Sequence, residues 1–354
     1  MNSTGVHGIY YKKRHIWTLT LIGLLIGLVL TVVITMGIGI ANIPATTTAS
    51  ILLSKIPLTN DMFHQSWPSN YEAIIMDVRL PRVLLGAMVG AALAVAGTTM
   101  QGLFRNPMAS PYVLGISSGA AFGASLTIVL NLTVLGKYTL SLMAFIFAIL
   151  TIFLVYSIAS KKGKISTHAV LLTGIAVSLF FSALVSFMIY ISGEELRAII
   201  FWIMGGLWAS TWGSLAIVLP MIVIGVAMIS LFSRELNVML SGKEQALSLG
   251  ISVSQVTKII LIFASLITAA AVSVSGCIGF VGLIVPHIMR NLVGPDHRIL
   301  LPASCLGGAI FLIWTDTIAR TITNPVELPV GIITGLLGAP FFIYLLRTKT
   351  KIFG

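Results

Sequence analysis

Gly-Lys pairs are the first places to look for chemistry, because the phosphate-binding loop of many ATPases ends in Gly-Lys followed by Ser or Thr. The hydroxyl of that Ser or Thr binds the Mg²⁺ ion that accompanies the nucleotide. Three Gly-Lys pairs occur here, each followed by a residue other than Ser or Thr: Gly136-Lys137-Tyr138, Gly163-Lys164-Ile165 and Gly242-Lys243-Glu244. The sequence therefore predicts no nucleotide site on this chain.

Metal-binding residue types are present, but they are scattered. Cys277 and Cys305 both lie in apolar runs, so neither a disulfide framework nor a cysteine-rich metal site is indicated. The six histidines show no spacing typical of metal ligands: His7, His15, His64, His168, His287 and His297. We therefore expect no metal site and no resident cofactor, and His168 and His287 alone do not supply the residues of an intramembrane enzyme.

Asp316 is the only acidic residue well inside an apolar run. Arg320 follows it by four residues, a spacing that predicts a local ion pair along one helix. Proton-coupled transporters place chains of Asp, Glu and His inside the membrane, and no such chain is visible here. If this protein moves a substrate, the sequence indicates that its energy source lies on another chain.

Composition defines the elements that must position these residues. The chain has 354 residues, of which 57% are hydrophobic and 9% charged, with a mean hydropathy of +1.04. Soluble domains carry about 25% charged residues, so we expect an all-α polytopic membrane protein in which residues 1–354 form one domain. At ~20 residues per spanning helix, the length allows about ten crossings. The candidate spans are 16–40, 83–104, 112–134, 139–160, 168–191, 212–232, 256–275, 278–292, 300–320 and 329–347.

An even number of spans places both termini on one side of the membrane. Most of the 21 lysines and arginines then fall on that side, which favours cytoplasmic termini and explains the net charge of +11 without nucleic acid. This topology makes residues 1–15 a cytoplasmic tail, 42–80 an external loop and 233–255 a cytoplasmic loop. Residues 16–40 are too long for a signal-peptide core and are predicted to be a retained first helix. The glycine-broken segment 198–211 indicates an interfacial or re-entrant helix.

Three dispersed regions of the sequence resemble a known family of membrane proteins. They lie at residues 79–120, 276–298 and 316–341, with marks such as Arg105-Asn106-Pro107, Pro286-His287, Asp296-His297-Arg298 and Glu327-Leu328-Pro329. Together they resemble the FecCD-type permease subunits of ATP-driven importers for iron–siderophore complexes, haem and cobalamin, over about residues 17–347.

This resemblance implies the type II importer permease fold and a homodimer in the cytoplasmic membrane that works by alternating access. It further implies two ATP-binding subunits on the cytoplasmic side, which would hold ATP and Mg, and an external substrate-binding protein. Ferric siderophore is the first choice of substrate, followed by cobalamin, haem and molybdate. The alternative of a different class is a secondary transporter or channel that works without ATP.

The resemblance assigns a docking role to three arginines on the external side. Arg79, Arg82 and Arg320 match family residues that receive acidic side chains of the binding protein. Charges at such a rim mainly set the rate and orientation of docking. The alternative is that these arginines only anchor the helices at the membrane interface.

The resemblance also implies a coupling segment and a cytoplasmic gate. Residues 242–250 match the loop that lies in a groove of the ATPase, and the pattern predicts a short helix ended by glycine. The residues expected to contact the ATPase are Gly242, Ala246, Leu247, Leu249 and Gly250; the alternative is a solvated surface helix. Matching gate residues are Ser166, Thr167 and His168, although His168 is bulkier than the family pattern, and the alternative is a helix cap.

Overall fold

The structure is a computed structural model that describes residues 3–39, 41–57, 67–161, 164–165, 167–323 and 325–349. Within these ranges the chain is helical, and its strands are the two-residue pair β1 (Ser160–Lys161) and β2 (Lys164–Ile165). The predicted all-α architecture is confirmed. Seven helices are long and apolar enough to cross a membrane by length and composition, counted over the described residues.

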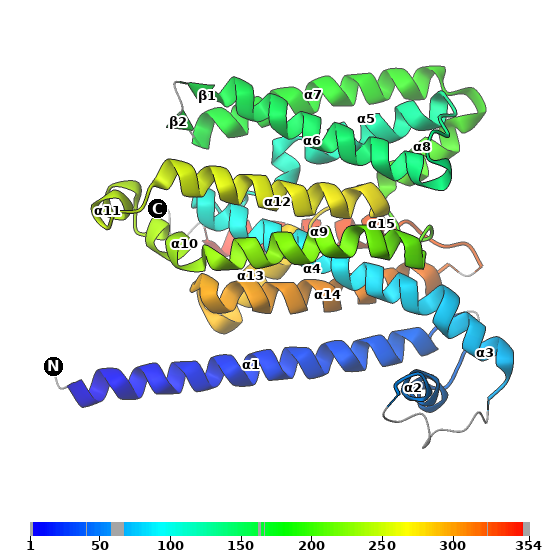
Figure 1. Cartoon of the computed structure of the whole chain (residues 1–354), viewed down its shortest axis with the longest axis horizontal. Helices are drawn as coiled ribbons and strands as arrows, with labels where there is room; N and C mark the ends of the chain where they lie inside the picture. The colour runs from blue at the N-terminus through cyan, green and yellow to red at the C-terminus, as the bar shows by residue number, and fades with distance from the viewer. Residues whose placement is uncertain are drawn as a thin grey trace.

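Each of the ten predicted spans corresponds to a helix (Figure 1). The helices are α1 (Ser3–Gly37), α4 (Leu80–Phe104), α5 (Ile116–Val129), α6 (Thr139–Ala159), α7 (Thr167–Ile191), α9 (Trp212–Leu231), α12 (Val253–Ser275), α13 (Val281–Val293), α14 (His297–Thr321) and α15 (Val330–Lys349). The eighth span is the short helix α13, which contains Pro286, in line with the shortening expected from a proline.

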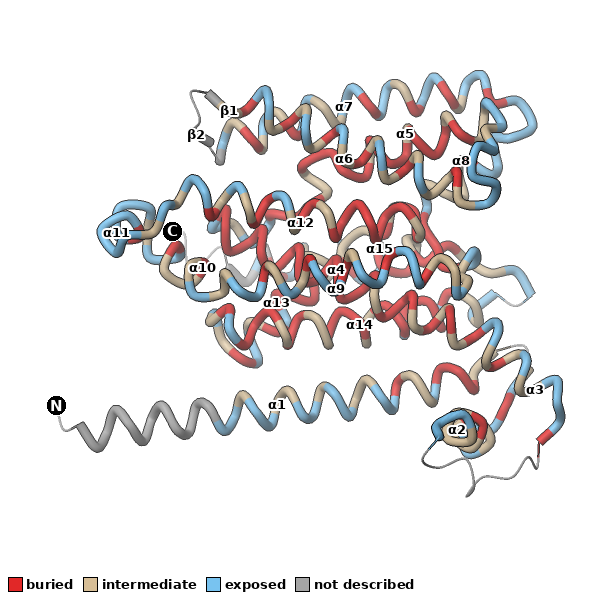
Figure 2. Tube along the Cα trace, in the orientation of Figure 1, coloured by how far each residue is buried: buried red, intermediate tan, exposed pale blue. Residues whose placement is uncertain are grey.

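Helix α4 lies at the centre of the bundle, and α1 and α7 lie at opposite edges (Figures 1 and 2). In the most apolar 18-residue stretch of the helix that contains α4, 89% of the residues are buried, against 17% in the most apolar stretch of α1. The exposed surface of α1 and α7 is made of large apolar side chains such as Leu25 and Leu179. Such side chains at the periphery fit a bundle whose solvent is lipid.

Small residues allow the central position of α4. A Cβ atom at Gly90 would lie 2.2 Å from the backbone oxygen of Gly308 in α14. A Cβ atom at Gly97 would lie 2.0 Å from the backbone oxygen of Gly282 in α13. Because only glycine permits such backbone contact between helices, these two positions fix how closely α4 packs on both neighbours.

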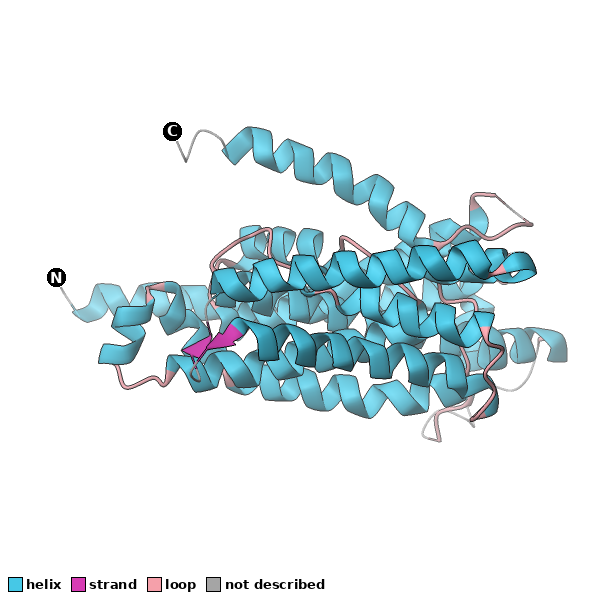
Figure 3. Cartoon of the chain, turned by 90° about the horizontal axis from the view of Figure 1, so that it is seen from above, coloured by secondary structure: helices cyan, strands magenta, loops and turns pink. Residues whose placement is uncertain are grey.

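The two ends of the bundle differ. One end, here called the α11 end, carries the start of α1, the β1–β2 pair, α10 (Ser233–Leu240) and α11 (Lys243–Ser248), and α15 runs back towards it (Figures 1 and 3). The first and last helices therefore have their outer ends on the same side, as an even number of spans requires.

The opposite end, here called the α3 end, carries α2 (Ala45–Ser54), α3 (Ser69–Ala73) and the π-helix η2 (Ile74–Arg79), which continues into α4. The stretch 42–80 that was expected to be a loop is thus largely helical where it is described. Segment 198–211 begins as helix α8 (Leu196–Met204), and residues 205–211 are not helical.

Candidate docking and coupling sites

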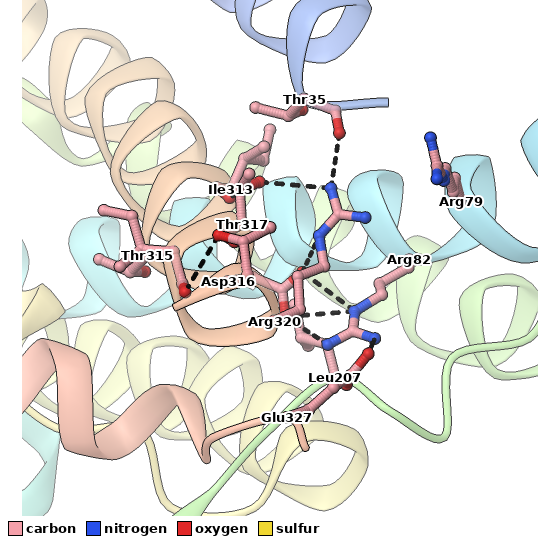
Figure 4. Close-up of polar contacts among 12 residues, drawn as sticks. Thr35, Arg79, Arg82, Leu207, Ile313, Thr315, Asp316, Thr317, Arg320 and Glu327 are labelled. Atoms are coloured by element: carbon pink, nitrogen blue, oxygen red, sulfur yellow. Dashed lines mark hydrogen bonds and ion pairs between the residues drawn. The ribbon is translucent and has the colours of Figure 1, made fainter. Parts of the chain in front are cut away.

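Charged side chains from four parts of the chain meet at the α3 end (Figure 4). Arg79 ends η2, Arg82 lies in the first turn of α4, Asp316 and Arg320 lie in α14, and Glu327 precedes α15. We call these five residues the arginine cluster. The structure therefore brings Arg320 together with Arg79 and Arg82, although it lies far from these two arginines in the sequence.

Arg82 is the centre of the arginine cluster. Its Nε lies 3.0 Å from Asp316 Oδ2 and its Nη2 lies 2.9 Å from Asp316 Oδ1, which makes a bidentate pair. Its Nη1 lies 2.9 Å from Glu327 Oε2. The side chains of Arg82 and Asp316 are only 12% and 4% exposed, so this is a buried pair.

The predicted ion pair of Asp316 with its i+4 neighbour Arg320 is present, with Arg320 Nε 3.9 Å from Asp316 Oδ2. This distance is outside hydrogen-bond range, so Arg82 is the closer partner of Asp316. The close packing of α4 on α14 brings Arg82 nearer than the i+4 neighbour. Glu327, which lies shortly before α15, is also bonded to Arg82.

Arg79 and Arg320 hold the end of α1. Arg79 donates from Nη1 to the carbonyl oxygens of Met36 and Gly37, the latter at 3.0 Å. Arg320 donates from Nη2 to the carbonyl oxygen of Thr35 (Figure 4). The last carbonyls of a helix have no partner within it and carry partial negative charge. The two guanidinium groups therefore cap the C-terminus of α1.

The arginines expected to be exposed for docking are thus buried and bonded within their own chain. Arg79 is 6% exposed, and the side chain of Arg320 is 7% exposed. Simple anchoring at the membrane interface does not describe them either, because their charged groups contact protein. A docking role remains a prediction, and it requires these groups to exchange their present partners.

The coupling segment forms the short helix that the sequence predicted. Helix α11 spans Lys243–Ser248, and Gly250 adopts a positive φ of 78° that favours glycine. Leu247 and Leu249 are 53% and 69% exposed, so both are available to a partner. Ala246 is fully buried against its own chain, so the expected contact of Ala246 with an ATPase does not fit this arrangement.

The predicted gate falls mostly outside what the structure describes. Ser166 lies outside the described residues, and α7 begins at Thr167. His168 is exposed in the first turn of α7, at the α11 end. The gate therefore stays a prediction. Among the described residues, no group of three or more His, Cys, Asp or Glu side chains could hold a metal ion.

Comparison with known proteins extends over nearly the whole chain. The profile of the FecCD transport family matches residues 15–348. The cobalamin import system permease protein BtuC of Halobacterium salinarum is 49% identical over 284 residues, covering 80% of this chain and 75% of that protein. The hemin transport system permease protein HmuU of Yersinia pestis is 40% identical over 336 residues, covering 93% and 96%.

A solved structure is similar as well. It is an inward-facing metal-chelate type ABC transporter, with a TM-score of 0.81 and 35% sequence identity. The match covers 93% of this chain and 98% of the solved chain.

Proposed function

This chain belongs to the FecCD transport family and is a membrane permease of the ABC importer class for metal chelates, and we propose that it works by alternating access, driven by two ATPase subunits on separate chains. The observation that carries this proposal is the family match over residues 15–348 in a sequence that has no Gly-Lys-Ser or Gly-Lys-Thr motif. A permease of this kind must receive its energy through contact with another protein.

The ATPase contact of this proposal lies on α11. Helix α11 lies at the end of the molecule, beyond the spanning helices (Figure 1). Leu247 in α11 and Leu249 directly after it are large apolar side chains that are exposed. Apolar groups on a water-exposed end are typical of a protein contact. We place this end in the cytoplasm together with both termini, since the basic residues concentrate there. The permease would be a homodimer in the cytoplasmic membrane.

The external binding protein would dock at the α3 end. We retain the matching arginines as its candidate contacts, and their burial sharpens the test. Arg79→Glu with Arg82→Glu should abolish stimulation of ATP hydrolysis by the binding protein. Because both arginines are buried and bonded, this variant should also unfold at a lower temperature than the wild type. Stimulation is therefore compared at a temperature at which the variant is still folded: its loss there supports docking, and unchanged stimulation would remove these arginines from the docking role.

The substrate class is a metal chelate, and the individual compound is to be identified by experiment. The relatives described above are named for cobalamin and hemin transport. Ferric siderophore, cobalamin, haem and molybdate are therefore tested side by side with the cognate binding protein, and the compound that co-purifies with that protein is expected to be the one transported.

The decisive experiment is uptake into proteoliposomes. The permease is reconstituted with its ATPase and binding protein, and uptake is measured with ATP and with a non-hydrolysable analogue. We expect uptake with ATP and none with the analogue. We also expect no uptake when the ATPase is left out. Uphill transport by the permease without an ATPase would refute the proposal and support a secondary transporter.

A further inference from the structure

A partly buried polar cluster at the α11 end has no part in the sites described so far. Asn237 of α10 donates from Nδ2 to Asp296 Oδ1 at 2.7 Å. Its Oδ1 accepts the backbone N–H of His297 at 2.7 Å and lies 3.0 Å from His297 Nδ1. His297, the first residue of α14, is only 1% exposed. One amide side chain therefore joins α10 to the beginning of α14.

The imidazole ring of His297 also reaches a third helix. A Cβ atom at Gly102 of α4 would lie 2.3 Å from His297 Nε2 and 2.9 Å from His297 Cε1. The ring therefore packs against α4 where that helix has no side chain. Gly102, Asn237 and His297 bring α4, α10 and α14 together, and we call these three residues the joint.

Capping the N-terminus of α14 requires neither Asn237 nor the imidazole ring of His297. Asp296 already accepts the backbone N–H of Arg298 at 3.1 Å, which is the usual cap at a helix N-terminus. Asn237 and the ring of His297 add links to two further helices. Buried polar networks of this kind fix one arrangement of the groups that they join.

Helix α10, which carries Asn237 of the joint, directly precedes and contacts α11. Helices α10 and α11 are separated by Ser241 and Gly242, whose backbone N–H groups are bonded back to Val238 and Met239 of α10. Ala246 anchors α11 to its own chain. A displacement of α11 would therefore also move α10. Asn237 links α10 to α14, and His297 links the beginning of α14 to α4.

We propose that Gly102, Asn237 and His297 are positioning residues that transmit movement of α11 to the packed pair α4 and α14. This inference rests on the proposed function, since it specifies how the ATPase contact reaches the spanning helices. It assigns the main connection to contacts across the fold rather than to α12, which follows α11 along the chain.

The test uses the tight fit between Gly102 and His297. Gly102→Ala should displace the imidazole ring and lower the stimulation of ATP hydrolysis by the binding protein roughly tenfold, within the usual range of coupling energies. His297→Asn is shorter than histidine and keeps a donor near the position of Nδ1. The double variant Gly102→Ala with His297→Asn should therefore recover stimulation. Gly23→Ala is the matched control, because a Cβ there meets nothing within 4 Å.

A second measurement needs only the permease. A spin label at position 249, in a background with Cys277 and Cys305 replaced, reports how firmly α11 is held. Gly102→Ala should increase the mobility of this label, and the double variant should restore it. Label mobility that is the same in all variants would overturn the inference, as would a double variant that couples no better than Gly102→Ala. Failure of the wild-type permease to bind any ATPase would refute the proposed function, and the label would still report on the joint.

Discussion

Removal of the Asp316 side chain should destabilise the permease more than removal of the side chain of Arg82 or of Glu327. Asp316→Ala leaves Arg82 and Arg320 close together and almost fully buried, with Glu327 as the remaining counter-charge in the arginine cluster. Arg82→Ala leaves Asp316 buried as well, but Arg320 stays 3.9 Å away and still compensates its charge in part.

Breaking a buried ion pair by removing one partner costs about 3–5 kcal/mol. Because of the compensation by Arg320, we expect Arg82→Ala at about 3 kcal/mol and Asp316→Ala at about 5 kcal/mol. Glu327 has a side chain that is 38% exposed, so Glu327→Ala should cost about 1 kcal/mol or less.

The measurement is thermal unfolding of the purified permease, without binding protein, followed by a dye that reacts with cysteines as they become accessible. Cys277 and Cys305 are free and partly buried, which suits this assay. Arg197→Ala is the control, because Arg197, in the first turn of α8, is an exposed arginine. If Asp316→Ala and Arg82→Ala unfold with the wild type, or if Glu327→Ala is as harmful as Asp316→Ala, the structural role of the buried pair is refuted.

Three further outcomes follow from other parts of the molecule. Gly90→Ala should cost about 1–3 kcal/mol because its Cβ would strike the backbone of Gly308, whereas Gly23→Ala should be neutral; the same unfolding assay compares them. Leu249→Asp should abolish co-purification of the ATPase at unchanged unfolding temperature. Hydrogen bonds from the neighbouring arginine lower the pKa of Asp296 to about 2, so its stabilisation is complete above its unfolded pKa of about 3.9 and is lost as the pH falls towards 2. The unfolding temperatures of wild type and Asp296→Asn should therefore converge between pH 4 and pH 2.

Hydropathy was sufficient to locate the helices of the predicted spans, because the membrane requires a long apolar run from each helix that crosses it, and seven of the described helices have such a run. Even the irregular cases followed local signals, such as Pro286 in the short helix α13 and the glycines around α11. The helices inside 42–80 were missed, since α2 and α3 are short and the stretch is rich in polar residues. Their formation depends on packing at the α3 end rather than on a periodic pattern.

The partners of the arginines could not be read from the sequence. Arg82 and Asp316 are 234 positions apart, and Arg79 is bonded to backbone carbonyls that any residue would supply. A backbone acceptor leaves no trace in residue identity, so only the placement of α1 reveals it. The joint could not be predicted either, because the types of residue at Asn237 and His297 do not indicate that they are in contact. Only the placement of α10 and α14 shows this contact.

The contacts between α4 and α14 explain how an event at one end of the permease can be felt at the other. The pair is held by Arg82 and Asp316 at the α3 end, by Gly90 against Gly308 in the middle, and by His297 against Gly102 at the α11 end. Partial opening at the first contact would leave a buried charge unpaired, which costs several kcal/mol. We therefore expect α4 and α14 to move together, so that the helices packed around them must supply the change between outward- and inward-facing states. A spin-label distance between α4 and α14 should then be the same in the nucleotide-free and ATP-bound transporter, and a change in that distance would contradict this reasoning.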